Sequence, residues 1–254
     1  MKIIDLRKAS GLPLKINLES SRLIFGKGMR KVAPEARTRK QMMPVLKEPA
    51  MRAPDEFYYM HRNVCLRKDA ARIKAAGLRY DVTVLPPFTV GEEFNKTFGH
   101  RHPCVLGTKV CYPEVYEVLT GRAHFLLQSE SEFIVFDARE GDKCVMLPGF
   151  GHVTVNPSPE ETLVMANWVC PSFKSDYSEY EQHGGSQWFD TAKGFVENRK
   201  YVSQAIRLMQ PRVFPEFGLT KKPMYAECMH SPKRFEWLVR PQNYLHVFSQ
   251  YREY

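Results

Sequence analysis

Seven short segments between residues 81 and 169 have the composition of β-strands, and they limit the folds open to this chain more than any other feature. Each is rich in Val, Ile, Leu, Phe or Thr and ends near Gly, Pro, Asp, Asn or Ser, the residues that favour turns. Short strands at this spacing predict an antiparallel barrel or sandwich, so a mainly β fold is expected. The segments are 81–85, 114–119, 123–128, 132–136, 143–147, 153–155 and 162–169.

The chain on either side of these strands has a different composition. Residues 1–79 contain scattered Pro, many Lys and Arg, and short apolar runs, which predicts an extended basic arm with a few strands, followed by a short helix at 68–76 that ends at Gly77. The tail favours helix more, with candidate helices at 195–209 and 232–238. We expect three parts: a basic N-terminal arm and short helix packed on the barrel (1–79), the barrel core (80–175), and a partly helical C-terminal extension that covers it (176–254).

At 254 residues and 43% hydrophobic composition, the chain can form a substantial core, as one domain with extensions or as two small domains. Its longest apolar runs are far shorter than the roughly twenty residues that span a membrane, and residues 1–7 lack the apolar segment of a signal peptide. We therefore expect a cytoplasmic protein without a membrane partner. The six cysteines form no Cys-x-x-Cys pair and are expected to be free thiols: Cys65, Cys104, Cys111, Cys144, Cys170 and Cys228.

The net charge of +9 is concentrated near the start of the chain, because residues 1–80 hold 19 Lys and Arg against 7 Asp and Glu. A basic segment of this kind can bind nucleic acid, attract a small anion, or simply form a solvated surface. No nucleic-acid motif and no pattern of base-stacking aromatic residues accompanies the charge. A solvated surface is the expected reading, and no nucleic-acid partner is expected.

His100 and His102 are two residues apart, so on a strand both imidazoles would point to the same side. The pair alone is a weak signal, because His-x-His occurs by chance. Glu114 and His152, in two other segments of the β region, complete a plausible set of ligands. Three neutral imidazoles and a carboxylate suit Fe²⁺, Mn²⁺, Ni²⁺ or Zn²⁺, and six-coordination would leave two positions for water or substrate. Open positions favour a catalytic site over a structural one.

At these residues the chain resembles the cupin superfamily. The first cupin motif is matched by His100, His102, Glu114 and Gly121, and the second by Gly141, Pro148, His152 and Asn156. Two spacings depart from the pattern: eleven residues separate His102 from Glu114, and Pro148 is one residue closer to His152 than is common. The resemblance implies an antiparallel jelly-roll barrel.

The resemblance narrows to the cupin-type glucose-6-phosphate isomerases over residues 80–180. It rests on Thr83-Val-Leu-Pro86, Gly91, Glu93, Thr97, Gly99-His-Arg-His102 and Glu114-Val-Tyr116. It implies a metal-dependent isomerase, a homodimer that acts on a phosphosugar, with one divalent ion per subunit, Fe²⁺ foremost. The ligands would be His100, His102, Glu114 and His152.

The resemblance also assigns the substrate contacts. Thr83, Thr97 and Gly99 would hold the phosphate, with Tyr177 as a further contact. Thr97 and Gly99 have the opposite parity to the two histidines, so we expect a bend or bulge at Gly99. The family has a Tyr near Cys170 and a His near Ser175 that this chain lacks, and Tyr180 or His183 are candidates to replace them.

For an aldose–ketose isomerisation, Glu114 is the candidate general base, with Tyr116 orienting it or the substrate. Glu93 is a second carboxylate and is expected to be structural. A hydride shift would use the same ligands without a base, and activity on mannose 6-phosphate is open. Two other readings remain: a cupin enzyme of another kind, such as an Fe²⁺ dioxygenase, and a non-catalytic sugar-binding regulator whose basic arm contacts nucleic acid.

Overall fold

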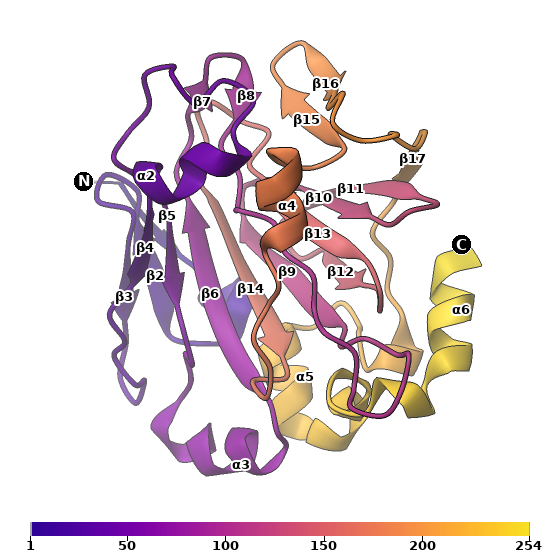
Figure 1. Ribbon diagram of the computed structural model, residues 1–254. Helices are drawn as coiled ribbons and strands as arrows, with labels where there is room; N and C mark the ends of the chain where they lie inside the picture. Colours follow the sequence, from indigo (N-terminus) through magenta and orange to yellow (C-terminus); the bar gives the residue numbers. More distant parts are fainter. Residues whose placement is uncertain (1, 254) are drawn as a thin grey trace.

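Two β-sheets facing each other form the centre of the structure, a computed structural model that describes residues 2–253 (Figure 1). The Tyr116 ring on one sheet lies 5.3 Å from the Phe125 ring on the other. The larger sheet has the order β12 (Lys143–Met146), β9 (Glu114–Thr120), β14 (Leu163–Val169), β6 (Arg79–Leu85), β5 (Glu56–His61) and β4 (Glu35–Thr38). The smaller has the order β13 (Gly151–Val155), β10 (Arg122–Gln128), β11 (Phe133–Arg139) and β17 (Ile206–Met209).

All seven strands expected between residues 81 and 169 are present, with ends shifted by a few residues. The expected mainly β fold, with a partly helical C-terminal part, is confirmed. Among residues 2–253 the hydrogen-bonded ladders form separate open sheets, so the barrel is not closed by strand pairing. Two strands from the basic arm, β5 and β4, extend the larger sheet beyond β6.

One face of the larger sheet points toward the smaller sheet. Residues directly opposite each other on paired strands share a face, which fixes the members of this row. Arg37 pairs with Tyr58, Met60 with Thr83, and Thr83 with Met165. The row continues across β14 and β9, where Asn167 pairs with Tyr116 and Val169 with Glu114.

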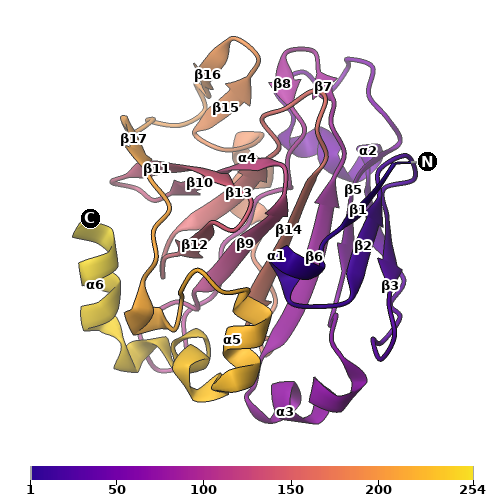
Figure 2. The ribbon, with the colours of Figure 1, turned by 180° about the vertical axis from the view of Figure 1, so that it is seen from behind.

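The other face of the larger sheet is covered by both ends of the chain. Figure 2 shows α1 (Arg7–Ser10) and α5 (Met224–His230) in front of this face, beside the small sheet of β1 (Ile3–Asp5), β2 (Leu14–Asn17) and β3 (Arg22–Phe25). Trp168 is fully buried there and donates a hydrogen bond to the carbonyl oxygen of Met224. All seven residues of β14 are buried because both of its faces are covered.

The remaining elements lie around the two sheets. A second small sheet has the order β16 (Gly194–Glu197), β15 (Trp188–Thr191), β8 (Glu93–Phe94) and β7 (Thr89–Val90). The short helices are α2 (Arg39–Met42), η1 (Met43–Val45), η2 (Arg67–Asp69), α3 (Ala70–Ala75), α4 (Ser178–His183), η3 (Pro215–Phe217), η4 (Pro232–Leu238), η5 (Pro241–Asn243) and α6 (Leu245–Glu253). Within residues 2–253, no helix is both long and apolar enough to cross a membrane.

The helix expected to end at Gly77 is present as η2 and α3. The two helices expected in the C-terminal extension have different outcomes. The segment 232–238 is helical, as the 3-10 helix η4. The helix expected at 195–209 is wrong, because this segment contributes β16 and β17 instead. β17 pairs in parallel with β11, so pairing with a distant strand overrides the local helix preference.

The expectation of six free thiols is also wrong. Cys104 and Cys111 form a disulfide, while Cys65, Cys144, Cys170 and Cys228 are free and buried. An isolated antiparallel bridge places Cys104 opposite Cys111 across the loop that joins His102 to Glu114. The disulfide therefore closes the loop that is longer than the usual cupin spacing.

Candidate metal centre and its cavity

Three imidazoles and one carboxylate converge at one end of a cavity between the two sheets. Glu114 is the first residue of β9, and His152 is the second residue of β13. His100 and His102 belong to a connecting segment rather than to a regular strand, which corrects the strand expected there. His100 is held by an isolated bridge to His152, with backbone N–H to O distances of 3.2 and 2.9 Å.

Gly99 allows this segment to turn toward the sheet. Its φ of 89° confirms the expected bend and lies in the region that side chains other than Gly rarely adopt. A Cβ at this position would lie 2.6 Å from the Tyr180 ring and 2.7 Å from Val153 Cγ2. Gly99 thus lets the backbone pass close to α4 and β13, which brings His100 into the cavity.

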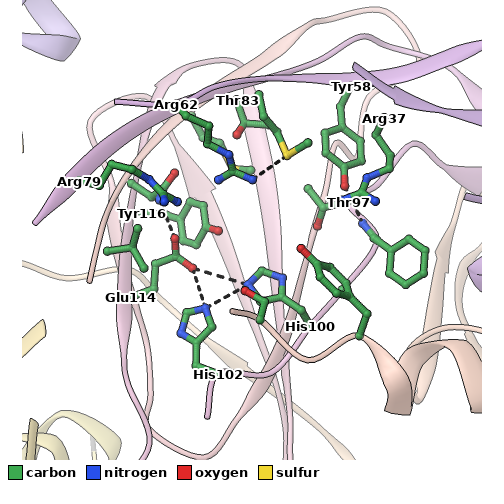
Figure 3. Close-up of a pocket in the computed structure, with 18 of the residues that line it drawn as sticks. Arg37, Tyr58, Arg62, Arg79, Thr83, Thr97, His100, His102, Glu114 and Tyr116 are labelled. Atoms are coloured by element: carbon green, nitrogen blue, oxygen red, sulfur yellow. Dashed lines mark hydrogen bonds and ion pairs between the residues drawn. The ribbon is translucent and has the colours of Figure 1, made fainter. Parts of the chain in front are cut away.

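The four donor atoms lie within 4.8 Å of one another, as expected for ligands of one ion. His100 Nε2 is 3.0 Å from His102 Nε2, and Glu114 Oε2 is 3.5 Å from His102 Nε2 (Figure 3). Glu114 Oε2 also lies 3.2 Å from His152 Nε2. Tyr112 fixes one imidazole from outside, because its carbonyl oxygen is 3.0 Å from His102 Nδ1. A proton on Nδ1 would leave the Nε2 lone pair directed at the cluster.

Burial and neighbouring charges set the protonation that a metal site needs. Burial lowers the pKa of His102 to about 4, and it lowers the pKa of His100 well below the usual value, helped by the facing His152 and His102. Burial alone would raise the pKa of Glu114, but the hydrogen bond from His152 and the nearby imidazoles lower it below its usual range. Neutral imidazoles and an ionised carboxylate are the forms that bind divalent ions.

The residues assigned to substrate by resemblance lie around the same cavity. Tyr116 projects from the strand that carries Glu114, and burial followed by the Glu114 carboxylate raises its phenol pKa well above the usual value. The Thr97 hydroxyl accepts a hydrogen bond from the Thr154 N–H over 2.9 Å, so its own proton remains available. The cavity is lined, among others, by Thr83, Thr97, Gly99, His100, His102, Glu114, Tyr116 and Tyr177.

Three other candidates are elsewhere. Tyr180 is fully buried against Gly99 and Gly151, and His183 stacks on Tyr201, so neither lines the cavity as a replacement. Glu93 is buried, pairs with Lys96 over 2.5 Å and does not line the cavity, as expected for a structural residue.

Several residues that complete the cavity are not predicted from the sequence. Asn167 donates to Glu114 Oε1 over 2.6 Å, and a lone Asn in the apolar segment 162–169 was a signal for it. Arg37, Arg62 and Arg79 also line the cavity. Nothing in their local sequence separates them from the other basic residues of the arm.

Comparisons with known proteins agree over the same region. A family model described as glucose-6-phosphate isomerase (GPI) matches residues 36–207, more than half of the chain. The glucose-6-phosphate isomerases of Thermococcus litoralis and Pyrococcus abyssi are 30% and 31% identical over 115 residues. Each alignment covers 45% of this chain and 57% or 58% of the relative, so the chain spans little more than half the length of these curated relatives.

Solved structures also resemble this chain. Vicilin from hazelnut (Corylus avellana) is 14% identical with a TM-score of 0.38, over 59% of this chain and 35% of the vicilin chain. The 7S globulin of Momordica charantia is 21% identical with a TM-score of 0.35, over 48% of this chain and 32% of the globulin chain.

The range matched by the family model includes the four converging donors and begins one residue before Arg37.

Proposed function

The chain belongs to the glucose-6-phosphate isomerase family, and from this we propose that it interconverts glucose 6-phosphate and fructose 6-phosphate, a step of glycolysis and gluconeogenesis. One observation carries the proposal: the four converging donors lie at the same cavity as the residues that the family resemblance assigns to the phosphosugar. Activity on mannose 6-phosphate and a homodimeric state are part of the proposal.

The proposed cofactor is one divalent ion held by His100, His102, Glu114 and His152. The donor set fits such an ion, because the four atoms converge and burial keeps His100 and His102 neutral. Fe²⁺ is the proposed ion, and Mn²⁺, Ni²⁺ or Zn²⁺ suit the same donors. When bound, the ion would supply Lewis-acid stabilisation of charge on the sugar oxygens.

The remaining chemistry belongs to the side chains. In the proposed route, Glu114 takes a proton from the substrate at C2 or C1 and returns it to the other carbon through an enediol. The lowered pKa of Glu114 keeps the carboxylate ionised, and the raised pKa of Tyr116 keeps its phenol protonated as a donor. Thr83, Thr97, Gly99 and Tyr177 are the proposed substrate contacts, and the Tyr177 ring lies 5.6 Å from the His100 ring.

An activity assay tests the proposal directly. Protein reconstituted with Fe²⁺ should form glucose 6-phosphate from fructose 6-phosphate, and a chelator should remove the activity. Mannose 6-phosphate should be measured in parallel. His152→Ala should lose both metal and turnover, whereas substitution of the exposed His246 by Ala should lose neither. Full activity in His152→Ala without bound metal would contradict the assignment of the four ligands.

Solvent labelling separates the two hydrogen-transfer routes. In deuterated water the enediol route predicts deuterium at C1 or C2 of the product, because the carboxylate exchanges its proton with solvent. Product without deuterium at either carbon would favour a hydride shift and would remove the role of base from Glu114. The isomerase assignment would survive that result.

A further inference from the structure

The guanidinium of Arg37 lies in the cavity without an acidic partner. Among residues 2–253 it forms no ion pair, and its Nε is a buried nitrogen without a hydrogen-bond partner. Three aromatic rings surround it, with the guanidinium carbon 5.5 Å from the Phe98 ring centre, 5.7 Å from Tyr177 and 5.9 Å from Tyr58. Aromatic faces hold a guanidinium in place and leave the edge of its plane open to donate N–H groups. The Tyr58 hydroxyl interacts with part of this edge in Arg37.

The two other arginines of the cavity are neutralised. Asp81, fully buried, lies 2.9 Å from the Arg62 guanidinium and 2.8 Å from that of Arg79. Glu35 also lies 4.0 Å from Arg62. Arg37 is therefore the cavity arginine whose charge the described residues leave without a carboxylate.

The position of Arg37 is opposite the metal centre. β4 is the edge strand of the larger sheet, and three strands, β5, β6 and β14, separate it from β9, which carries Glu114. Figure 3 shows Arg37, Tyr58 and Thr97 on one side of the cavity, Glu114 and His102 on the other, and His100 between them. The cavity thus has a carboxylate and imidazoles at one end and an unpaired cation with hydroxyls at the other.

This polarity matches a sugar phosphate. We propose that Arg37 binds the phosphate of the substrate and sets the preference for phosphorylated over neutral sugars. A guanidinium offers two parallel N–H donors and a positive charge to phosphate oxygens, and neutral hydroxyls and backbone amides do not supply that charge. The Thr97 hydroxyl, with its proton still available, lies beside the same place. The inference rests on the proposed function for the identity of the sugar.

The test is calorimetric binding of fructose 6-phosphate and of inorganic phosphate to the metal-loaded protein. Arg37→Met should weaken fructose 6-phosphate binding 10- to 100-fold and abolish phosphate binding, while metal content stays unchanged. Arg37→Lys should recover part of the affinity, because it restores charge without the planar fork. Arg52→Met is the matched control: it removes one charge from an exposed position of the same arm and should leave binding unchanged.

Kinetics provide a second readout that does not depend on one variant folding well. For an interaction present in both substrate and transition state, KM for fructose 6-phosphate should rise at nearly constant kcat. Arg37→Gln, which keeps a polar side chain, should show the same split if Arg37→Met is unstable. Unchanged affinity in all Arg37 variants would overturn the inference, even in an active isomerase. Wild-type protein that binds fructose 6-phosphate through Arg37 but does not isomerise it would instead overturn the proposed function.

Discussion

Asn167 Nδ2 donates a 2.6 Å hydrogen bond to Glu114 Oε1, the oxygen that faces away from the imidazoles. The other oxygen, Oε2, lies 3.2 Å from His152 Nε2. The carboxylate is therefore oriented from both sides, and Asn167 is itself held by its place on β14, between β9 and β6. Partners that hydrogen-bond to a ligand from outside fix its orientation and so affect the affinity of the site for metal.

We predict that Asn167→Leu weakens metal binding by about 10- to 100-fold, the usual cost of losing a partner that orients a ligand. The substitution keeps the branching and the number of heavy atoms of the side chain but leaves Glu114 Oε1 buried without a donor. Metal content after dialysis and titration with Mn²⁺ provide the measurement. Asn243→Leu, at an exposed position, should retain the wild-type affinity. Equal metal affinity in both variants would show that Asn167 only fills space.

Gly99 and Gly141 form a matched pair for testing the bend that places His100. Their φ angles are 89° and 88°, but a Cβ on Gly99 would strike Tyr180 and Val153, whereas a Cβ on Gly141 would meet no atom within 4 Å. Gly141→Ala should therefore cost only the backbone term, about 1 kcal/mol. Gly99→Ala should cost roughly 2 to 4 kcal/mol, since steric overlap adds to that term.

Denaturant unfolding of the two variants measures this difference, and metal titration shows whether His100 has moved. Gly99→Ala should also bind metal less tightly, because relief of the overlap displaces the next residue. Equal stability losses in the two variants would mean that α4 moves away from a Cβ at residue 99 at little cost in free energy. The close approach at Gly99 would then not contribute to stability.

The sequence was most informative where side-chain chemistry and strand periodicity coincide. Glu114 and His152 lie in two separate β segments of the sequence, where they complete the expected ligand set, and the structure brings both to one point. His100 and His102 converge as expected even though they do not lie on a regular strand, because Gly99 and the bridge to His152 replace the strand geometry.

The missed features depend on contacts between distant parts of the chain. Arg37 reaches the cavity only because β4 pairs with β5, and nothing in a basic, Pro-containing arm indicates that pairing. The error at 195–209 has the same origin, since β17 is formed by its pairing with β11. Local propensity carries no information about such partners.

The disulfide leads to a prediction about the loop between two candidate ligands. Titration of the denatured protein with a thiol reagent should find four reactive cysteines before reduction and six afterwards. Closing this short loop should stabilise the fold by about 2 kcal/mol, an effect that reduction removes. The Tyr112 carbonyl that faces His102 lies in the same loop, so Cys104→Ser with Cys111→Ser should also weaken metal binding several-fold. Six reactive thiols before reduction would contradict the pairing.

His61, a buried histidine away from the metal centre, should make the stability of the fold depend on pH. It is 1% exposed, and burial lowers its pKa from 6.5 to about 4. Between pH 6.5 and 4, His61 is therefore protonated in the unfolded chain but remains neutral in the folded protein. This group leaves the free energy of unfolding undiminished above pH 6.5 and lowers it as the pH falls toward 4, by about 3 kcal/mol.

His61→Phe keeps the ring beside Phe25 and removes the titration. The free energy of unfolding, measured in urea at several pH values from 4 to 7, should fall less steeply with acidification in His61→Phe than in the wild type. Substitution of the exposed His246 by Phe should keep the wild-type slope. Because the metal ligands titrate identically in all three proteins, only the difference between slopes is assigned to His61. Identical slopes would mean that the buried imidazole accepts its proton in the folded state after all.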